Sequence, residues 1–320
     1  MQTNGSQDRP FVIDGVAHAY DFSPNNRVAS STPERNERFA RFAYQLGHIA
    51  VESLEPGYAL SLNEFTSRWF AEDLAHAFFV ESDVDMVVHH HVEISSYWSQ
   101  GAARYDTGIA LREAAPDRVL LYGCVDTFGD MNKALESMHK MAEDGVSGFK
   151  FYPSNGFYDL NANALKVMFY NTPEKAFRFF ETAAKLGIRQ LAFHKAQPIG
   201  PGPMSQVSVE DVSTAAVAFP DMTFEIVHDG WAFLEESAVQ MLLHQNVYAN
   251  LECVVNLVVR QPRKFAHILG TLIQYGGDDR ILFATGCAVN HPDPILQAFM
   301  EFQIPQDLVD GYGYEPLTAE

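Results

Sequence analysis

Several short apolar runs in this chain end in residues of the types that bind metal ions. The residues at these ends are four histidines and one glutamate: His18, His91, His194, His228 and Glu252. Strands that close into a parallel barrel all finish on one face, so polar groups at their ends converge. Converging imidazoles and carboxylates supply the nitrogen and oxygen ligands of a metal site. The pattern therefore predicts a parallel fold whose strand ends surround a metal ion.

The apolar runs themselves indicate how many strands the chain contains. Eight runs are strand-like, and most are apolar throughout: Val12–His18, Asp85–His91, Val119–Val125, Gly148–Tyr152, Gln190–His194, Thr223–His228, Val247–Glu252 and Arg280–Thr285. Continuous apolar runs are typical of strands that are buried on both faces, as in a parallel sheet. Helical patterns separate the runs, so the sequence predicts an α/β fold of the (β/α)8 TIM-barrel type.

The connection between the first two runs is much longer than a single helix. It extends from Tyr20 to Asp83 and contains two helical patterns, at about Glu34–Ser53 and Asn63–Val80. We predict that residues 21–83 form a helical lid inserted after the first strand, over the C-terminal face of the barrel. Because no shift in composition marks a boundary, we expect one barrel domain over residues 1–320.

Composition and charge exclude several classes of partner. The formal net charge of −19 argues against nucleic acids and anionic membranes, which bind basic surfaces. No apolar run approaches the roughly 20 residues of a membrane span. The polar first ten residues lack the apolar core of a signal peptide, and the cysteines, Cys124, Cys253 and Cys287, do not suggest a disulfide framework. We therefore expect a cytoplasmic protein.

The order of the motifs resembles that of amidohydrolase-related proteins. Asp14-x-Val16-x-His18 is similar to their Asp-x-His-x-His opening, and the Gly148–Pro153 segment is similar to their fourth strand. His194 and His228 match the metal-binding histidines of their fifth and sixth strands. The resemblance covers nearly the whole chain, and it is to the branch that includes aminocarboxymuconate semialdehyde decarboxylase.

This resemblance implies a metal site. The predicted ligands are His18, His194, His228 and Glu252, with Lys150 as a further candidate. Lys150 occupies the position at which dinuclear members of the superfamily carry a carboxylated lysine, so a carbamate there would be a bridging anion and a catalytic group. The alternative is a plain lysine that pairs with a carboxylate. Glu252 needs a partner in any case, because a carboxylate that ends an apolar run is costly to bury alone.

Two positions depart from the family pattern. Val16 replaces the first histidine of the opening motif, and Gly286 replaces the aspartate that normally ends the eighth-strand segment. A glycine can neither bind a metal nor transfer a proton, so ordinary hydrolysis and ordinary decarboxylation are both in doubt. The remaining ligand types resemble those of a divergent branch, the dinuclear iron or iron–manganese oxygenases built on this barrel.

The first prediction is accordingly an iron-type monooxygenase that uses O2 to hydroxylate a small organic substrate. Its cofactor would be a divalent metal, either Fe/Fe or Fe/Mn, and zinc is the other candidate. The alternative is a metal-dependent hydrolase or a non-oxidative decarboxylase in which Glu252 or His291 replaces the aspartate. A second alternative is a partner subunit of a homologous active barrel. We expect a homodimer or a heterodimer with such a barrel.

Four further residues are predicted around the metal. His291 follows Gly286 in its loop and is a candidate catalytic group. Tyr20 lies just beyond His18, and Trp231 lies just beyond His228, so both are candidates for substrate binding. His91 is a third candidate, because alternation along a strand directs His91 and His90 to opposite sides.

Overall fold

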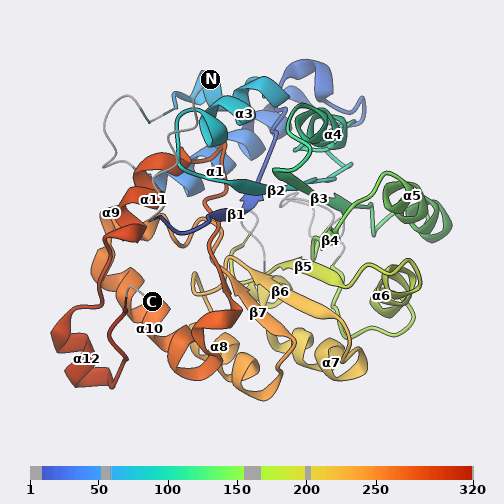
Figure 1. Ribbon diagram of the computed structural model, residues 1–320. Coiled ribbons are helices and arrows are strands. Elements are labelled where there is room, and N and C mark those ends of the chain that lie inside the picture. Colours follow the sequence, from blue (N-terminus) through green and yellow to red (C-terminus); the bar gives the residue numbers. More distant parts are fainter. Residues whose placement is uncertain (1–8, 52–57, 59, 155–166, 199–202, 319–320) are drawn as a thin grey trace.

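Eight parallel strands form one sheet that curls into a nearly closed barrel (Figure 1). The computed structural model describes residues 9–51, 58, 60–154, 167–198 and 203–318. The strands pair in chain order: β1 Ile13–Ala17, β2 Met86–His90, β3 Val119–Cys124, β4 Gly148–Phe151, β5 Gln190–His194, β6 Thr223–Val227, β7 Val247–Asn250 and β8 Ile281–Leu282. The predicted (β/α)8 TIM-barrel class is confirmed.

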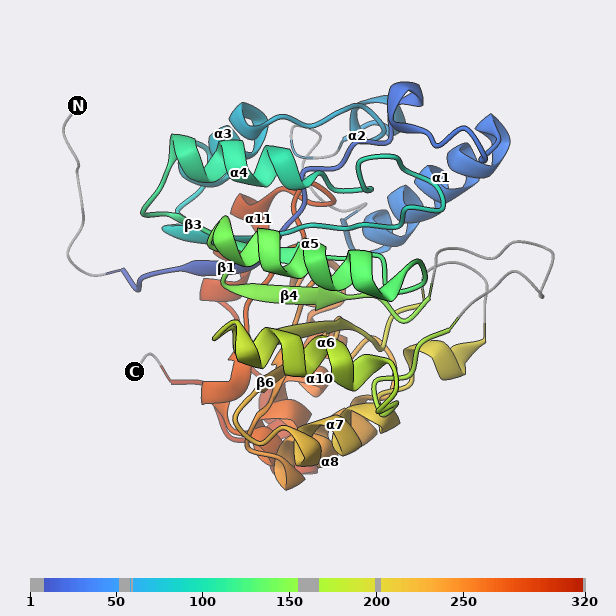
Figure 2. The same ribbon diagram turned by 90° about the vertical axis from the view of Figure 1, so that its right-hand side faces the viewer.

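Helices surround the strands, and α4 to α7 follow one another along the outside of the barrel in Figure 2. The helices are α1 Pro33–Val51, α2 Leu62–Phe65, α3 Ala71–Phe79, α4 Tyr105–Ala114, α5 Met131–Glu143, α6 Ala176–Lys185, α7 Glu210–Ala218, α8 Leu234–Leu243, α9 Leu257–Arg260, α10 Pro262–Gly276, α11 Pro292–Met300 and α12 Gln306–Tyr312. The carboxylate of Asp130 accepts hydrogen bonds from the first free amides of α5, which starts that helix. Within the described residues, no helix is long and apolar enough to cross a membrane.

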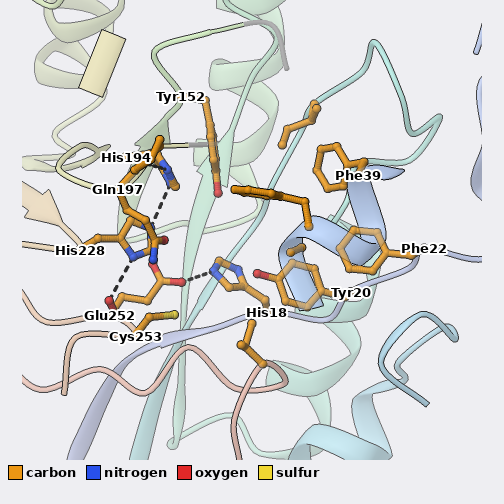
Figure 3. A pocket seen from close by; sticks show the side chains of 15 residues that line it. His18, Tyr20, Phe22, Phe39, Tyr152, His194, Gln197, His228, Glu252 and Cys253 are labelled. Atoms are coloured by element: carbon orange, nitrogen blue, oxygen red, sulfur yellow. Dashed lines mark hydrogen bonds and ion pairs between the residues drawn. The ribbon is translucent and has the colours of Figure 1, made fainter. Parts of the chain in front are cut away.

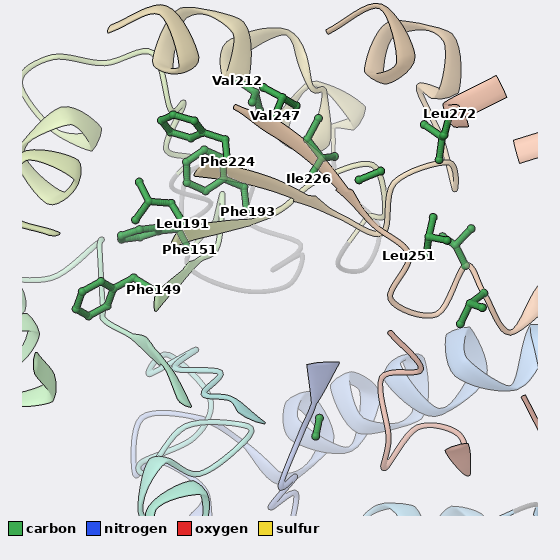
Figure 4. Packing of buried hydrophobic residues seen from close by; sticks show 14 of the residues in the cluster. Phe149, Phe151, Leu191, Phe193, Val212, Phe224, Ile226, Val247, Leu251 and Leu272 are labelled. Atoms are coloured by element: carbon green, nitrogen blue, oxygen red, sulfur yellow. The ribbon is translucent and has the colours of Figure 1, made fainter. Parts of the chain in front are cut away.

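The core lies between the strands and the helices. Phe149, Phe151, Phe193 and Phe224 point outward from β4, β5 and β6 into this layer (Figure 4). Burying one such side chain contributes about 1.5–3 kcal/mol. Successive residues of a strand point to opposite faces, so the alternation that directs these rings outward directs Lys150, which lies between two of them, into the barrel.

A buried carboxylate joins the last strand segment to the first. Asp14 accepts hydrogen bonds from the backbone nitrogen of Thr285, at 3.1 Å, and from its hydroxyl, at 2.6 Å. The nitrogen of Gly15 also donates to the carbonyl of Phe283, at 2.8 Å. Burial raises the pKa of Asp14 to about 7, although these hydrogen bonds act to lower it. Side-chain and backbone hydrogen bonds thus complete the closure. Strand β8 is shorter than the predicted Arg280–Thr285.

The segment between β1 and β2 contains α1, α2 and α3. The helix predicted over Asn63–Val80 is divided: α2 ends at Phe65, and α3 begins at Ala71. Both short helices have acidic residues in their first turns, and Ser61 and Glu64 form a capping box on α2. Residues 52–57 and 59 of the predicted insertion lie outside the described residues.

Candidate metal centre

A cavity of about 80 Å³ lies at the carboxyl ends of the strands (Figure 3). One side of it carries groups that can bind a metal: His18, His194, His228, Glu252 and Cys253. The other side is aromatic: Tyr20, Phe22, Phe39, Phe42 and Tyr152. Phe39 and Phe42 come from α1, so the long segment after β1 supplies part of the wall.

His194 and His228 face each other with ring nitrogens that carry no hydrogen. Nε2 of His194 lies 2.9 Å from the carbonyl oxygen of Gln197, and Nδ1 of His228 lies 3.0 Å from the carbonyl oxygen of Glu252. A carbonyl only accepts, so each of these nitrogens must be the donor, and the other nitrogen of each ring has a free lone pair. The two free nitrogens are 3.1 Å apart.

Two lone pairs at this distance repel each other unless a cation or a proton lies beside them. Burial lowers the pKa of His228 to about 4 and that of His194 well below its usual value. Both rings are therefore neutral near neutral pH, and the free nitrogens are not occupied by protons. Backbone carbonyls that orient imidazoles in this way are typical of metal sites.

Glu252 lies between His18 and His228. Its Oε1 atom is 2.8 Å from Nε2 of His18, and its Oε2 atom is 3.6 Å from Nε2 of His228. His18 follows the same rule as the other two rings, because its Nδ1 atom is 3.0 Å from the carbonyl oxygen of His90. Its Nε2 atom lies at hydrogen-bonding distance from the carboxylate of Glu252 and so holds that side chain in place. Within the described residues, Oε2 of Glu252 accepts no hydrogen bond.

The charge of Glu252 follows from its neighbours. Burial acts to raise its pKa, but His228, His18 and Lys150 outweigh burial and lower that pKa well below its usual value. Glu252 is therefore ionised, and ring nitrogens of His18 and His228 face its two oxygens. A cation placed among them would satisfy every one of these groups, and the donor set of histidine and carboxylate fits a divalent metal.

The glycine at position 286 explains how Glu252 reaches this place. A β-carbon on Gly286 would lie 3.1 Å from Cγ of Glu252 and 3.1 Å from Sγ of Cys253. The side chains of Glu252 and Cys253 thus occupy the space that a residue larger than glycine would need. The left-handed backbone of Gly286, with a φ of +71°, also disfavours other residues.

Lys150 lies inside the barrel behind Glu252 and does not line the cavity. Its Nζ atom is 3.7 Å from Oε2 of Glu252 and has no hydrogen-bond partner among the residues that the structure describes. Burial lowers the pKa of Lys150, although the nearby carboxylates act to raise it. The position of Lys150 agrees with one of its two predicted forms, an unmodified lysine that pairs with a carboxylate. The other form, a carboxylated lysine, also stays open, because Nζ has no hydrogen-bond partner among the described residues.

Of the three predicted substrate-binding residues, Tyr20 lines the cavity, with its ring centroid 5.0 Å from that of His18. His91 and Trp231 do not line it. Nε2 of His91 is instead 3.2 Å from Oε2 of Glu93, because the residue after β2 turns away from the barrel interior. Trp231 packs against the outer core, and its loop leads away from the strand ends towards α8.

The predicted catalytic residue His291 also lies outside this cavity. Its Nε2 atom is 3.0 Å from Oε2 of Glu81, and its Nδ1 atom accepts a hydrogen bond from the first turn of α11. Residues that the sequence did not single out complete the cavity instead, among them Tyr152 and Cys253. Both residues could have been predicted from their neighbours in the sequence, since Tyr152 ends the fourth apolar run and Cys253 directly follows Glu252.

The sequence matches the model of the amidohydrolase family Amidohydro_2 over residues 74–320, which is more than half of the chain. The chain belongs to the amidohydrolase family. The predicted resemblance is confirmed, and the neighbouring structures include decarboxylases with the same barrel. Among proteins with curated descriptions, none matches this sequence.

Three solved structures illustrate the likeness of fold. An uncharacterized TIM-barrel protein from Bordetella bronchiseptica is 18% identical, with a TM-score of 0.63 and 94% of each chain covered. A dihydroxybenzoic acid decarboxylase from Polaromonas sp. JS666, solved with manganese and the inhibitor 2-nitroresorcinol, is 13% identical, with a TM-score of 0.57; the match covers 95% of this amidohydrolase and 94% of the decarboxylase. A probable 2-pyrone-4,6-dicarboxylic acid hydrolase from Acinetobacter baumannii is 11% identical, with a TM-score of 0.54 and coverages of 95% and 100%.

Proposed function

We propose that this amidohydrolase is a divalent-metal-dependent decarboxylase that acts on a small aromatic acid without oxygen. The observation that carries the proposal is the facing pair of free nitrogens of His194 and His228, which lie in one cavity with His18 and the ionised Glu252. Two of the three structural neighbours named above have an activity in their description, one a decarboxylase and the other a probable hydrolase. They support the predicted alternative, a hydrolase or decarboxylase, better than the predicted oxygenase, and they give no support to iron in particular.

The metal would be held by His18, His194, His228 and Glu252, which line the same cavity. A bound divalent ion supplies positive charge against the electron pair that remains when carbon dioxide leaves. Manganese, zinc and iron are the ions to test, because a mixed nitrogen and oxygen donor set suits all three.

The lining of the cavity favours an aromatic acid as the substrate. Among the described residues that line it, Glu252 is the one carboxylate, and none is a lysine or an arginine. The charged end of an acid is therefore directed to the metal site, while the ring contacts the aromatic wall. When neutral carbon dioxide leaves, the negative charge of the carboxylate passes to the ring carbon until a proton is added there, and an apolar surrounding removes the water that stabilises the starting carboxylate.

Tyr20 and Tyr152 are placed to supply the proton that replaces the carboxyl group. Figure 3 shows both rings beside the histidines, and the ring of Tyr152 stacks on that of His194 at 5.0 Å. Burial raises the pKa of both phenols well above the usual value, so both keep their hydrogen at neutral pH. A protonated hydroxyl next to the reacting carbon can act as a general acid and regain its proton from water.

Hydrolysis is the second candidate, and the free Oε2 atom of Glu252 favours it. If the histidines alone hold the metal, this oxygen can accept a proton from an attacking water. A decarboxylase does not need that base. The two candidates therefore differ in the role of Glu252, which is a ligand in the first and a base in the second.

The test uses purified protein that is stripped of metal and reloaded with manganese, zinc or iron under nitrogen. Hydroxylated benzoic acids and a cyclic lactone acid are supplied, and both released carbon dioxide and ring-opened product are measured. We expect metal-dependent carbon dioxide release that is unchanged by oxygen. Ring opening with incorporation of labelled water would favour the hydrolase. Turnover only in air would contradict the proposal and support the predicted oxygenase. Failure to bind any metal would also contradict the proposal, and it would agree with an inactive partner subunit.

A further inference from the structure

Cys253 places a sulfur atom next to the groups described above. One ligand atom from each of His228, Glu252 and Cys253 lies within 4.8 Å of the other two. Figure 3 shows the side chain of Cys253 beside the carboxylate of Glu252, on the same side of the cavity as the histidines. Ligands of one zinc-sized ion lie about 2.0–2.3 Å from it, so a shift of about 1 Å would bring all three atoms onto a common ion.

The backbone explains how two successive residues can both point into the site. In an extended strand, the side chains of Glu252 and Cys253 would point to opposite faces. The backbone of Cys253 is instead left-handed, with a φ of +61°, and His228 has a φ of +69°. A non-glycine residue in this region costs on the order of 1–3 kcal/mol and usually persists where function requires it. The strain at Cys253 turns its sulfur towards the metal-binding groups.

The space for the sulfur is provided by Gly286. Sγ of Cys253 lies 3.1 Å from the position of a β-carbon on that glycine, which is closer than a carbon and a sulfur ordinarily approach. The unpartnered and buried Oε2 atom of Glu252 is a second sign that a ligand belongs here. The other cysteines of the chain, Cys124 and Cys287, are buried as well but do not line this cavity.

We propose that Cys253 is a thiolate ligand of the metal, so that the site combines nitrogen, oxygen and sulfur donors. This inference rests on the metal site of the proposed function. On binding, the thiol loses its proton to solvent as the sulfur–metal bond forms, with no change in oxidation state. A thiolate favours zinc, iron(II) and cobalt(II) over the harder manganese ion. The chain should therefore retain zinc or cobalt at concentrations at which manganese dissociates.

The test is the near-ultraviolet spectrum of protein loaded with cobalt(II), in which a sulfur ligand produces a charge-transfer band. We expect the band in the parent protein and in Cys287→Ala, which removes a buried thiol outside the cavity. Cys253→Ser and Cys253→Ala should lose it. A parent protein that holds cobalt without the band would overturn the proposal and leave the metal site intact. A parent protein that holds no cobalt, zinc or manganese would instead overturn the proposed function.

A second measurement needs no variant. The rate at which iodoacetamide alkylates each cysteine is measured by mass spectrometry in the native protein, with and without zinc. Because only the free thiolate reacts, zinc should slow alkylation of Cys253 roughly ten-fold or more. The rate at Cys287 should not change. Equal rates at Cys253 with and without zinc would contradict metal–sulfur bonding.

Discussion

Two buried glutamates, Glu225 and Glu252, lie in the same barrel and have opposite surroundings. Both belong to neighbouring parts of the sheet, since Glu225 is in β6 and Glu252 follows β7. Each oxygen of Glu225 has a neutral donor: the hydroxyl of Tyr122 is 2.7 Å from one, and the amide of Asn250 is 3.1 Å from the other. Glu252 faces ring nitrogens of His18 and His228, and one of its oxygens accepts no hydrogen bond within the described residues.

The difference separates a structural carboxylate from one that awaits a cation. Burial raises the pKa of Glu225, and its two hydrogen bonds only partly oppose this. Glu252 is equally buried, yet its pKa is lowered well below normal by the groups around it. A buried acid that is satisfied by neutral donors needs nothing more. A buried carboxylate that stays ionised needs positive charge around it, and this distinguishes the metal site from the rest of the barrel interior.

The largest expected effect comes from neutralising each glutamate in turn. Glu252→Gln should weaken zinc binding by more than about 100-fold. Removing a group that only hydrogen-bonds to a metal ligand weakens binding by up to about 100-fold, and the loss of a ligand itself should cost more. Glu225→Gln is the matched control, because it makes the same chemical change in the same barrel. It should keep zinc at the parent stoichiometry. Metal content per chain after dialysis against a weak chelator measures both.

Equal loss of zinc in the two variants would show that the barrel interior acts as a unit and that the contrast between the glutamates is wrong. Retention of zinc in both would place the metal elsewhere. Circular dichroism of each variant checks that the barrel is still folded.

The sequence predicted the barrel and much of the candidate site because both depend on strand ends. The alternation of apolar runs with helical patterns was sufficient to identify the barrel. His18, His194, His228 and Glu252 lie together in the structure for the same reason, since parallel strands bring their carboxyl ends to one face. Their role as ligands stays a prediction until metal binding is measured.

The remaining positions depended on the path of the chain beyond the strands. His291 pairs with Glu81 outside the cavity because its loop leads into α11, and no apolar pattern reports that direction. Cys253 reaches the cavity only through a left-handed backbone, which a strand pattern does not predict. In the sequence, Gly286 stands where related proteins have the eighth-strand aspartate. In the structure, it gives room to Glu252 and Cys253, which follow β7.

A smaller effect tests that role of Gly286. Gly286→Ala would place a β-carbon 3.1 Å from both Glu252 and Cys253, at a φ of +71°. We expect the free energy of unfolding to fall by about 1–3 kcal/mol from backbone strain. We also expect weaker zinc binding, because Glu252 and Cys253 must move. Urea denaturation and zinc titration measure the two effects.

Gly187→Ala is the matched control for this change. Gly187 also has a positive φ, of +80°, but nothing lies within 4 Å of its β-carbon position. The control should show the strain cost without any change in zinc affinity. If Gly286→Ala binds zinc as tightly as Gly187→Ala does, the two side chains beside Gly286 do not depend on the space that it leaves.

The smallest effect is a pH dependence that isolates Glu225. Its pKa is raised in the folded protein above the value of about 4.3 for an unperturbed glutamate. A raised folded pKa means that the unfolded chain releases this proton first as the pH increases. The contribution of Glu225 to stability is therefore fully present below about pH 4.3 and is lost as the pH rises through the folded pKa. Glu225→Gln cannot ionise, so the parent protein should lose stability relative to this variant as the pH rises above about 4.3.

Urea denaturation of metal-free protein at several pH values measures the difference in free energy of unfolding between the parent protein and Glu225→Gln. Groups that both proteins share, such as Asp14, contribute equally to the two free energies and cancel in the difference. Glu252 should behave in the opposite sense. Its lowered pKa makes its contribution constant above about pH 4.3 and lost below it, so the comparison of parent protein with Glu252→Gln should be flat from pH 5 to pH 8. A flat difference for Glu225→Gln, or a sloping one for Glu252→Gln over that range, would mean that the two buried carboxylates do not differ in ionisation as their surroundings require.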